Sequence, residues 1–567
     1  MRTNRWSALT LVAALAACGA ETGGGGGSSD RPDGRASGAN DAAGTSECYA
    51  SNECPIGWTC SELGTCQPPV GGVDGGGTAP PEVELELGQP QAAERYLYVG
   101  MPESDTLVKI DGTTLTVATV PVGDAPEVVR AIPGGDDAIA LDVGSATATI
   151  VRPTVDRDER VSLRTLPRLN SLAVDPTGRT AIAWFDLKRA LAAGVPLSAI
   201  GSFQDVTVVG LVRGAEVAVD LSVGFRPREV EFDAAGTHAY VITDDGVSVI
   251  DLAAALAGEV SVVAAIPVVA DPLAFDAAAA AEVEITSDGQ HAVARVDGEA
   301  WLTVTALATG VRHVVPLAAP ATDVDLLPDG TRALALLRDA DRAVILDLPG
   351  DAIDPSGAEV IDLGTLALGG HVGSATLSAD GRRALLFTNA TAIERVATLD
   401  LAASPVTASV RVLQKAVRTA GFAPDGRTAL ILHARTGDGT GGTVAAIVDA
   451  AWGYSVLDLD TGFVKLTLTP VDPGAFAFAP DATTAYLALS AGAAEGARSS
   501  LQVIDLRSFV VEDVRLGSPP ELVGVLPAAG VAFVTQTHPL GRVTFVPLGE
   551  TSTRTVTGFE LNSHIVD

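Results

Sequence analysis

The strongest constraint on the fold is a short turn motif that recurs along most of the chain. It reads Pro-Asp-Gly, or a variant of it, and is followed by two residues and then by Ala at the start of an apolar run, as in Pro424-Asp425-Gly426 before Ala429. Nine copies occur, about 49 residues apart on average. Their alanines are Ala138, Ala181, Ala239, Ala292, Ala333, Ala384, Ala429, Ala485 and Ala532. A fixed period of this length predicts a propeller or a solenoid.

The runs between the turns decide between these two architectures. In the unit around Ala239, short runs at residues 228–232 and 238–243 flank the turn, and a third run at residues 247–251 alternates with a period of two. The fourth run of a unit often ends in Val-Gly, as at Val223-Gly224. This period excludes a helical repeat, for which it would be 3.6. Four short strands with tight turns in each unit are typical of a propeller blade.

The order of these short motifs also resembles a known family. Pro-x2-Val-x-Phe, Asp/Ala-x-Gly-x2-Ala-Tyr-Val, Val-Ser-Val-Ile-Asp and Val-Gly follow one another, with the best match at residues 226–252, and together they resemble the YVTN-type, WD40-like β-propeller repeat. The resemblance extends roughly from residue 95 to residue 560. It implies an all-β propeller of four-stranded blades. It is also typical of exported or surface proteins that act as binding modules, with a minority of lactonases and redox enzymes.

The repeats predict a propeller over residues 95–567 with nine full units and a split one, so nine to ten in all. One ten-bladed ring, two smaller propellers and a ring with a degenerate unit all remain open. The split unit begins at Tyr96 with its second strand, and we predict that the tail at 558–566 supplies the missing first strand, because closure removes exposed sheet edges. A helical pattern over residues 186–200 interrupts the second full unit.

The N-terminus carries an export signal. Arg2 and Arg5 precede an apolar run at residues 8–17, which is too short to span a bilayer, since a spanning helix needs about 20 residues. The run ends in Leu-Ala-Ala followed by Cys18, which resembles a bacterial lipobox. The resemblance implies that residues 1–18 are a lipoprotein signal peptide and that Cys18 is lipidated; an ordinary signal peptide with an incidental Cys is the alternative. Gly19 in place of Asp favours the outer membrane of a Gram-negative cell envelope, by analogy.

Three segments separate this anchor from the propeller. Residues 19–46 are rich in Gly and Ser and predict a disordered tether, and residues 68–94 form a second linker. Between them, residues 47–67 hold four evenly spaced cysteines, which are Cys48, Cys54, Cys60 and Cys66. In an exported chain an even number of cysteines predicts two disulfides, with three pairings open. Zinc is the less favoured alternative, because the spacing lacks a C-x2-C pair and no His lies nearby.

Charge and motifs limit the function. The net charge of −33 repels phosphate backbones and argues against nucleic acid as a partner. The sequence contains no C-x2-C-H, H-E-x2-H, G-x4-G-K-[ST] or G-x-S-x-G motif. We therefore predict no catalytic residue, and the prediction leans away from an enzyme without excluding one.

One feature of the repeat points to a ligand site. On the first strand of each unit, the residues eight and ten positions before the repeated Ala are mostly small or apolar, but three consecutive units carry acids there. These acids are Glu229, Glu231, Glu282, Glu284, Asp323 and Asp325. First strands line the channel of a propeller, so the acids predict either a site for Ca²⁺ or a cationic ligand, or a wet channel in which Arg130, Arg228 and Arg418 offset their charge.

Two functions fit these features. The first is a membrane-anchored scaffold whose propeller binds a protein, a peptide or a glycan. The alternative is a cation-dependent, lactonase-like hydrolase with its site in the channel. Convergence of the six acids to within metal-binding distance would favour the hydrolase, and acids that splay apart would favour the scaffold.

Overall fold

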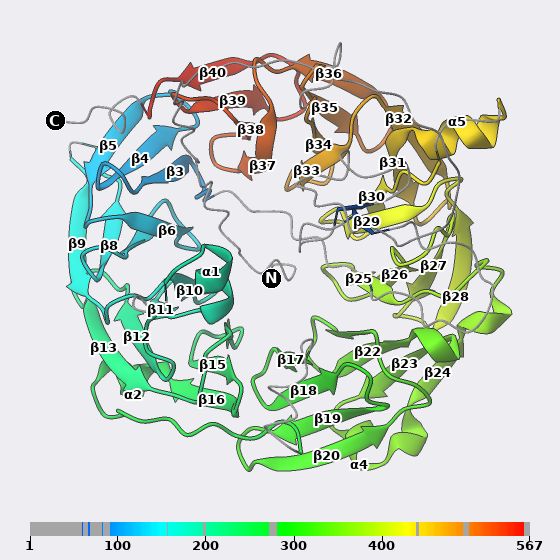
Figure 1. Cartoon of the computed structure of the whole chain (residues 1–567), viewed down its shortest axis with the longest axis horizontal. Coiled ribbons are helices and arrows are strands. Elements are labelled where there is room, and N and C mark those ends of the chain that lie inside the picture. Colours follow the sequence, from blue (N-terminus) through cyan, green and yellow to red (C-terminus); the bar gives the residue numbers. More distant parts are fainter. Residues whose placement is uncertain are drawn as a thin grey trace, which may run out of the picture.

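The computed structural model describes residues 59–60, 66–67, 82, 91–155, 157–196, 200–270, 281–437, 442–491 and 498–560. In this part of the chain ten antiparallel sheets follow one another around a single ring (Figure 1). Eight of them have four strands, and β3-β4-β5 and β14-β15-β16 have three. The predicted all-β propeller of four-stranded blades is confirmed, and the ring has ten blades, numbered here in chain order. The YVTN type of the repeat stays a prediction.

The strands of a blade lie side by side, with the first strand nearest the ring axis and the fourth at the rim (Figure 1). The first strands are β6 (Pro126–Ala131), β10 (Ser171–Val174), β14 (Glu229–Phe232), β17 (Ala281–Ile285), β21 (Asp323–Leu326), β25 (Ser374–Leu377), β29 (Val417–Phe422), β33 (Pro473–Phe478) and β37 (Pro520–Leu526). The second strands are β3 (Tyr96–Met101), β7 (Ala138–Asp142), β11 (Thr180–Trp184), β15 (His238–Thr243), β18 (His291–Val296), β22 (Arg332–Leu337), β26 (Arg383–Phe387), β30 (Thr428–His433), β34 (Thr484–Leu489) and β38 (Val531–Gln536).

The outer half of each blade completes the sheet. The third strands are β4 (Thr106–Asp111), β8 (Thr147–Arg152), β12 (Asp205–Gly210), β16 (Gly246–Asp251), β19 (Trp301–Ala306), β23 (Arg342–Asp347), β27 (Arg395–Asp400), β31 (Trp452–Asp458), β35 (Ser500–Asp505) and β39 (Arg542–Pro547). The fourth strands are β5 (Val117–Pro121), β9 (Glu159–Arg164), β13 (Val217–Ser222), β20 (Val311–Pro316), β24 (Glu359–Asp362), β28 (Thr407–Val412), β32 (Val464–Thr469), β36 (Val511–Arg515) and β40 (Arg554–Thr557).

Short helices and a separate hairpin decorate this frame. The helices are α1 (Leu187–Ala192), α2 (Leu252–Leu256), α4 (Gly350–Ile353) and α5 (Val444–Ala450), and the 3-10 turns are η3 (Arg338–Ala340), η4 (Pro355–Gly357) and η5 (Leu363–Thr365). The helix expected within residues 186–200 is therefore present as α1. Outside the ring, β1 (Thr59–Cys60) pairs with β2 (Cys66–Gln67).

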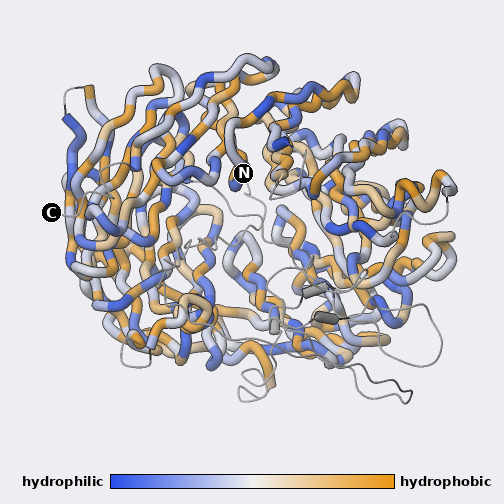
Figure 2. The backbone as a smooth tube through the Cα atoms, turned by 45° about the horizontal axis from the view of Figure 1, so that its top comes forward, coloured by the Kyte–Doolittle hydropathy of each residue, from blue (hydrophilic) through white to orange (hydrophobic). Residues whose placement is uncertain are grey.

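The repeated alanine marks where neighbouring blades pack. All nine of these alanines lie on second strands and are completely buried. The cores lie between blades, as where Leu430 and Tyr454 of blade 8 meet Leu487 and Ile504 of blade 9. Figure 2 shows apolar stretches repeating from strand to strand around the ring. Burial of these faces on both sides of each sheet supplies the main driving force for the fold.

Two properties of the turn require glycine at the third position of the repeated motif: its backbone conformation and its close contact with the preceding blade. Gly178 has a φ of +70° and Gly236 a φ of +63°, a conformation that residues with a Cβ adopt rarely. A Cβ on Gly178 would also lie 2.6 Å from the Pro133 carbonyl oxygen, and one on Gly236 would lie 2.6 Å from Asp175 Oδ1. In both cases the contact belongs to the turn of the preceding blade, so the motif encodes the spacing between blades as well as the turn.

The ring closes where blade 10 packs on blade 1, since Leu97 and Ile110 share a core with Phe533 and Phe545. Ala92 forms a bridge with Leu97 and so takes the place of a first strand in blade 1.

The prediction that residues 558–566 fill this place is wrong for the part of the tail that is described. Gly558 N instead donates to Leu540 O at 3.1 Å, on its own blade. The segment just before β3 needs only a tight turn to reach this strand, with Ala93 N donating to Tyr96 O at 2.9 Å, and short closures cost little entropy.

Two faces of the ring follow from the strand order. Because neighbouring strands are antiparallel, connections after second and fourth strands open on one side, which we call the interblade face. Connections after first and third strands open on the other side, which we call the turn face. Helices α1 and α5 follow second strands and lie on the interblade face, whereas α2 and α4 follow third strands and lie on the turn face.

Candidate functional site

The six predicted acids lie on β14, β17 and β21, the first strands of blades 4, 5 and 6. First strands occupy the inner ends of the blades, as β17, β25 and β37 show in Figure 1. The placement expected from the repeat is therefore observed.

Three of these acids reach along the ring to the next blade. Glu231 Oε2 accepts a hydrogen bond from Ile285 N of blade 5 at 3.4 Å. Glu284 Oε2 accepts one from Leu326 N of blade 6 at 2.7 Å, and this side chain is buried.

Asp323 Oδ2 accepts in the same way from Ala375 N of blade 7 at 2.6 Å. Each carboxylate thus binds a backbone N–H on the inner edge of the following first strand. The three bonds join four consecutive blades, and this edge would otherwise leave backbone donors without a protein partner.

A fourth acid is paired within its own blade. Glu282 Oε2 lies 2.7 Å from Arg295 Nε, and the two residues stand opposite each other in the pairing of β17 with β18. Burial lowers the pKa of Arg295, but Glu282, Asp297 and Asp323 together raise it above its ordinary value, so the guanidinium stays charged. The remaining acids, Glu229 and Asp325, are half-buried on the same strands.

Two of the arginines predicted to offset these acids form ion pairs with aspartates outside the set of six. Arg228 Nη2 lies 2.5 Å from Asp244, and Arg418 Nη1 lies 2.6 Å from Asp472. Arg130 lies near Arg189 of α1, and burial together with that positive charge lowers the pKa of Arg130 to about 10. The offset of the acids by these arginines stays a prediction, and Arg295 is a counter-ion of Glu282 that the sequence argument missed. Its signal was present in the sequence: the hairpin register places position 295 opposite position 282.

The acids do not gather at one point in the described residues. Within that part of the chain no group of three or more His, Cys, Asp or Glu side chains is placed to hold a metal ion. The six acids are distributed over three consecutive first strands of the ring. A Ca²⁺ site at these residues stays a prediction.

A buried polar group in blade 8 was missed by the sequence argument. His433 is completely buried; its Nδ1 donates to Ala416 O at 3.1 Å, so Nε2 is the acceptor for the Ser455 hydroxyl at 2.7 Å. Burial lowers the pKa of His433 to about 4. Nearby Lys415, also completely buried, donates to Val448 O at 2.8 Å and to Asp449 O at 3.3 Å, which fixes the end of α5. The residues around each group are those of a structural core.

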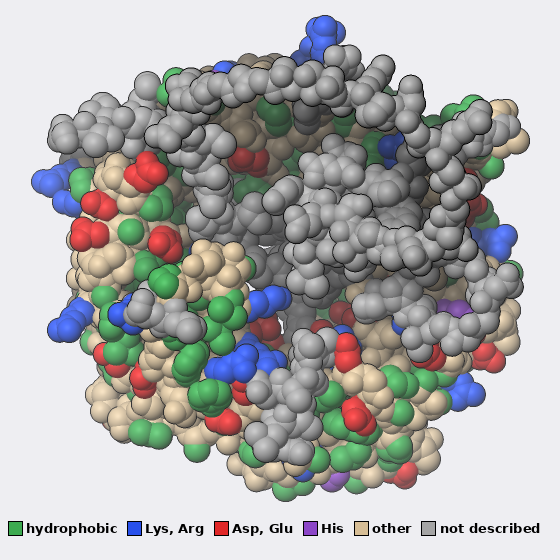
Figure 3. All heavy atoms as spheres, in the orientation of Figure 1, with side chains coloured by type: hydrophobic (Ala, Val, Ile, Leu, Met, Phe, Trp, Pro, Cys, Tyr) green, Lys and Arg blue, Asp and Glu red, His purple; other side chains and the backbone are tan. Residues whose placement is uncertain are grey.

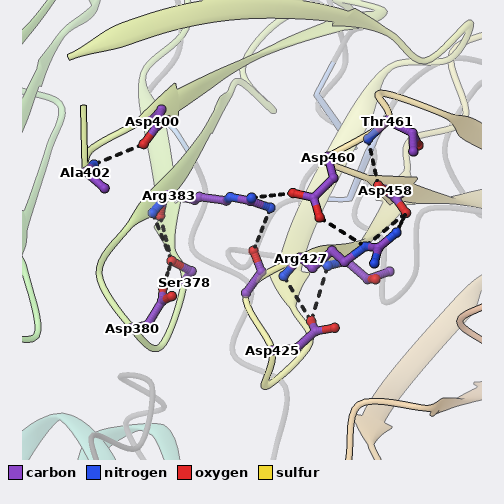
Figure 4. A network of polar contacts seen from close by, with 12 residues as sticks. Ser378, Asp380, Arg383, Asp400, Ala402, Asp425, Arg427, Asp458, Asp460 and Thr461 are labelled. Atoms are coloured by element: carbon purple, nitrogen blue, oxygen red, sulfur yellow. Dashed lines mark hydrogen bonds and ion pairs between the residues drawn. The ribbon is translucent and has the colours of Figure 1, made fainter. Parts of the chain in front are cut away.

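Ion pairs also join blades on the turn face. Figure 4 shows Arg383 of blade 7 reaching Asp460 of blade 8. Asp460 in turn lies 3.3 Å from Arg427, which binds Asp458 at 2.7 Å. These side chains are partly exposed, and in the orientation of Figure 3 acids and bases are scattered over the visible described surface. The network therefore stabilises the contact between two blades modestly.

Some predicted site residues lie outside the described residues. These residues are Cys18, Cys48 and Cys54. For Cys60 and Cys66 only the backbone is described, and the two residues lie opposite each other in the pairing of β1 with β2. Lipidation and both disulfides stay predictions. Among the described helices, none is long and apolar enough to cross a membrane.

Comparison with known proteins adds likenesses of fold only. No family model matches the chain, and no curated protein matches it. A eukaryotic initiation factor structure covers 74% of this chain and 96% of its own, at 13% identity and a TM-score of 0.45. Dihydro-heme d1 dehydrogenase NirN covers 77% and 74%, at 13% identity and a TM-score of 0.39. The Cps50 (Swd1) β-propeller domain of Myceliophteria thermophila covers 59% and 97%, at 12% identity and a TM-score of 0.30. Likenesses this distant say nothing about what the chain binds.

Proposed function

We propose that this chain is a lipoprotein of the bacterial cell envelope, held by a lipid on Cys18 in the outer membrane, whose ten-bladed ring is a scaffold that binds a protein, a peptide or a glycan. The lipobox and the tether support the anchoring. A flexible tether of the composition of residues 19–46 reaches about 30 Å on average, enough to hold the ring clear of the membrane surface.

The use of the inner acids carries the proposal for the ring. Glu231, Glu284 and Asp323 bind the backbone of the next blade, and Glu282 binds Arg295. A hydrogen bond to a charged group contributes about 1.5–3 kcal/mol, so these acids stabilise a fixed arrangement of blades. A rigid ring is what a binding scaffold needs, whereas a cation-dependent hydrolase would require the same carboxylates to turn from the backbone to a metal.

The anchoring is tested with the substitution Cys18→Ala. The wild-type chain is expected to take up labelled palmitate and to sediment with membranes, and the variant is expected to do neither. Unlabelled wild-type protein in the soluble fraction would contradict the anchoring and would leave the binding proposal intact.

The binding is tested with photo-crosslinking residues placed at two matched positions in the native host. Leu191 on α1 lies on the interblade face and its exposed fraction is 58%, while Ile353 on α4 lies on the turn face with 64%. A discrete adduct from position 191 that is absent from position 353 is the expected result. Absence of adducts from both faces would contradict the scaffold proposal.

A further inference from the structure

One acidic side chain from outside the ring is seated on the interblade face. Glu82, which precedes the propeller in sequence, places its carboxylate between blades 6 and 7. Its Oε1 accepts from the Thr388 hydroxyl at 2.7 Å and from Arg338 Nη1 at 3.4 Å. Its Oε2 accepts from Asn389 N at 2.9 Å and from Ala390 N at 3.2 Å. Four donors thus bind the two oxygens of one carboxylate.

The pocket is closed and charged. The Glu82 side chain is 8% exposed and that of Arg338 is 10% exposed. One carboxylate oxygen accepts from two successive backbone N–H groups, and the other accepts from a hydroxyl and a guanidinium. This set of donors favours an anion and disfavours an amide, because the NH₂ group of an amide would face other donors. The site therefore distinguishes Glu from Gln.

The fold shapes the pocket from both blades. Arg338 begins η3, directly after the second strand of blade 6, and residues 388–390 follow the second strand of blade 7. Gly373 lies between them, and the Thr322 hydroxyl donates to its carbonyl oxygen at 2.8 Å. A Cβ on Gly373 would lie 2.5 Å from Glu82 Oε1. Glycine at this position leaves the room that the carboxylate occupies.

We propose that this pocket, formed by Arg338, Gly373 and residues 388–390, is a recognition site for a glutamate side chain in an extended acidic segment of a partner protein, and that Glu82 is an intramolecular ligand that the partner displaces. The proposal rests on the scaffold function above and names the class of its partner. The sequence from Glu82 onward alternates acids with Val and Leu up to residue 87, and this indicates the kind of segment the site accepts.

Competition between the two ligands follows from their linkage. A segment that belongs to the same chain as the ring acts at an effective concentration of roughly millimolar order. A free segment of equal intrinsic affinity is therefore excluded at micromolar concentration while Glu82 is in place. Removing the Glu82 carboxylate should open the pocket to a free peptide.

The test uses the full chain and a fluorescent peptide with the sequence of residues 78–86, with binding followed by anisotropy. The peptide is expected to bind the Glu82→Ala chain at least tenfold more tightly than the wild type. A matched peptide with Gln in place of Glu82 keeps the other two acids and is expected to bind at least tenfold more weakly to the Glu82→Ala chain. Adding Gly373→Val to the Glu82→Ala chain fills the pocket without changing its charge and should abolish binding.

Three results would overturn the proposal: equal affinity of the two peptides, equal affinity of the two chains, or binding that survives Gly373→Val. Absence of peptide binding to a Glu82→Ala chain that keeps its melting temperature would overturn it as well. If Gly373→Val fails to fold, Arg338→Gln in the Glu82→Ala background replaces it. The assay needs no cellular partner, so its failure is distinguishable from a failure of the crosslinking experiment.

Discussion

The inner strands of blades 4–6 and of blades 8–10 solve the same problem in opposite ways. Eight positions before the repeated Ala, the first group carries Glu231, Glu284 and Asp325, whereas the second carries Gly421, Ala477 and Gly524. In the first group carboxylates reach the backbone of the next blade. In the second group the blades approach directly, so that a Cβ on Gly421 would lie 2.9 Å from Phe476 Cζ.

The contrast gives Glu231 and Glu284 a structural role at the junctions between blades. In blades 4–6, long charged side chains connect neighbouring first strands through hydrogen bonds. In blades 8 and 9, the small residue Gly421 leaves room for the Phe476 ring of the next blade. One repeat therefore carries two kinds of junction around one ring. The two kinds should respond differently to acid, to loss of a carboxylate and to added volume.

The largest expected effect is an acid sensitivity of the small-residue half, through His433. Its pKa is about 4 in the folded chain, below the ordinary value of 6.5, so the unfolded chain binds the proton first as the pH falls. The stability that neutral His433 contributes is complete above pH 6.5 and is lost progressively down to about pH 4, by about 3 kcal/mol. The measurement is urea unfolding of the wild type and of His433→Gln between pH 7 and pH 4, with hydrogen exchange of β30 and β31.

His433→Gln should remove this part of the pH dependence, and β30 and β31 should lose protection before β17 and β18. The same pH dependence in both chains would contradict the assignment. Asp142 acts in the opposite direction, since burial raises its pKa to about 6, and the difference between the two chains cancels its contribution.

Loss of one bridging carboxylate should have the next largest effect. Glu284→Ala removes the acceptor of the buried Leu326 N–H and is expected to destabilise the chain by about 2 kcal/mol. Glu512→Ala, at an exposed acid on the outer strand β36, is the matched control and should change stability by less than about 0.5 kcal/mol. Equal effects in calorimetry would mean that the inner acids are not bridges.

These two halves also show what the sequence could predict. A two-residue alternation and a fixed period are local properties of the sequence. They predicted the strands, the turns of the blades and the position of the six acids on the inner strands. The partners of the acids did not, because the register between one blade and the next has no local signal. The Glu82 pocket was hidden for the same reason: its donors lie in blades 6 and 7, far along the chain from the acid they bind.

Added volume should affect the small-residue half alone. Gly421→Ala places a methyl group against the Phe476 ring and is expected to destabilise the chain by about 1 kcal/mol, because tight cores tolerate extra atoms poorly. Gly135→Ala is the matched control, since a Cβ there meets no atom within 4 Å, and its effect should be close to zero. Thermal unfolding of both variants measures the difference. If Gly421→Ala leaves the stability unchanged, the junction of blades 8 and 9 can accommodate an additional methyl group.

The smallest expected effect is a stabilisation by calcium in the acid-bearing half. A cation at the inner acids must compete with the backbone N–H groups that three of them already bind. At a calcium concentration equal to Kd the gain is about 0.4 kcal/mol. The melting temperature of the wild type should rise slightly, and that of a chain with all six acids changed to their amides should not.

Where the six-fold variant fails to fold, Glu229→Gln with Asp325→Asn replaces it, because this variant keeps the bonds of Glu231, Glu284 and Asp323 to the next blade. Equal shifts with calcium in the wild type and the variant, or none in either, would rule out a cation at these residues. Glu231, Glu284 and Asp323 would then act as bridges between blades, and the partner would have to be sought elsewhere on the ring.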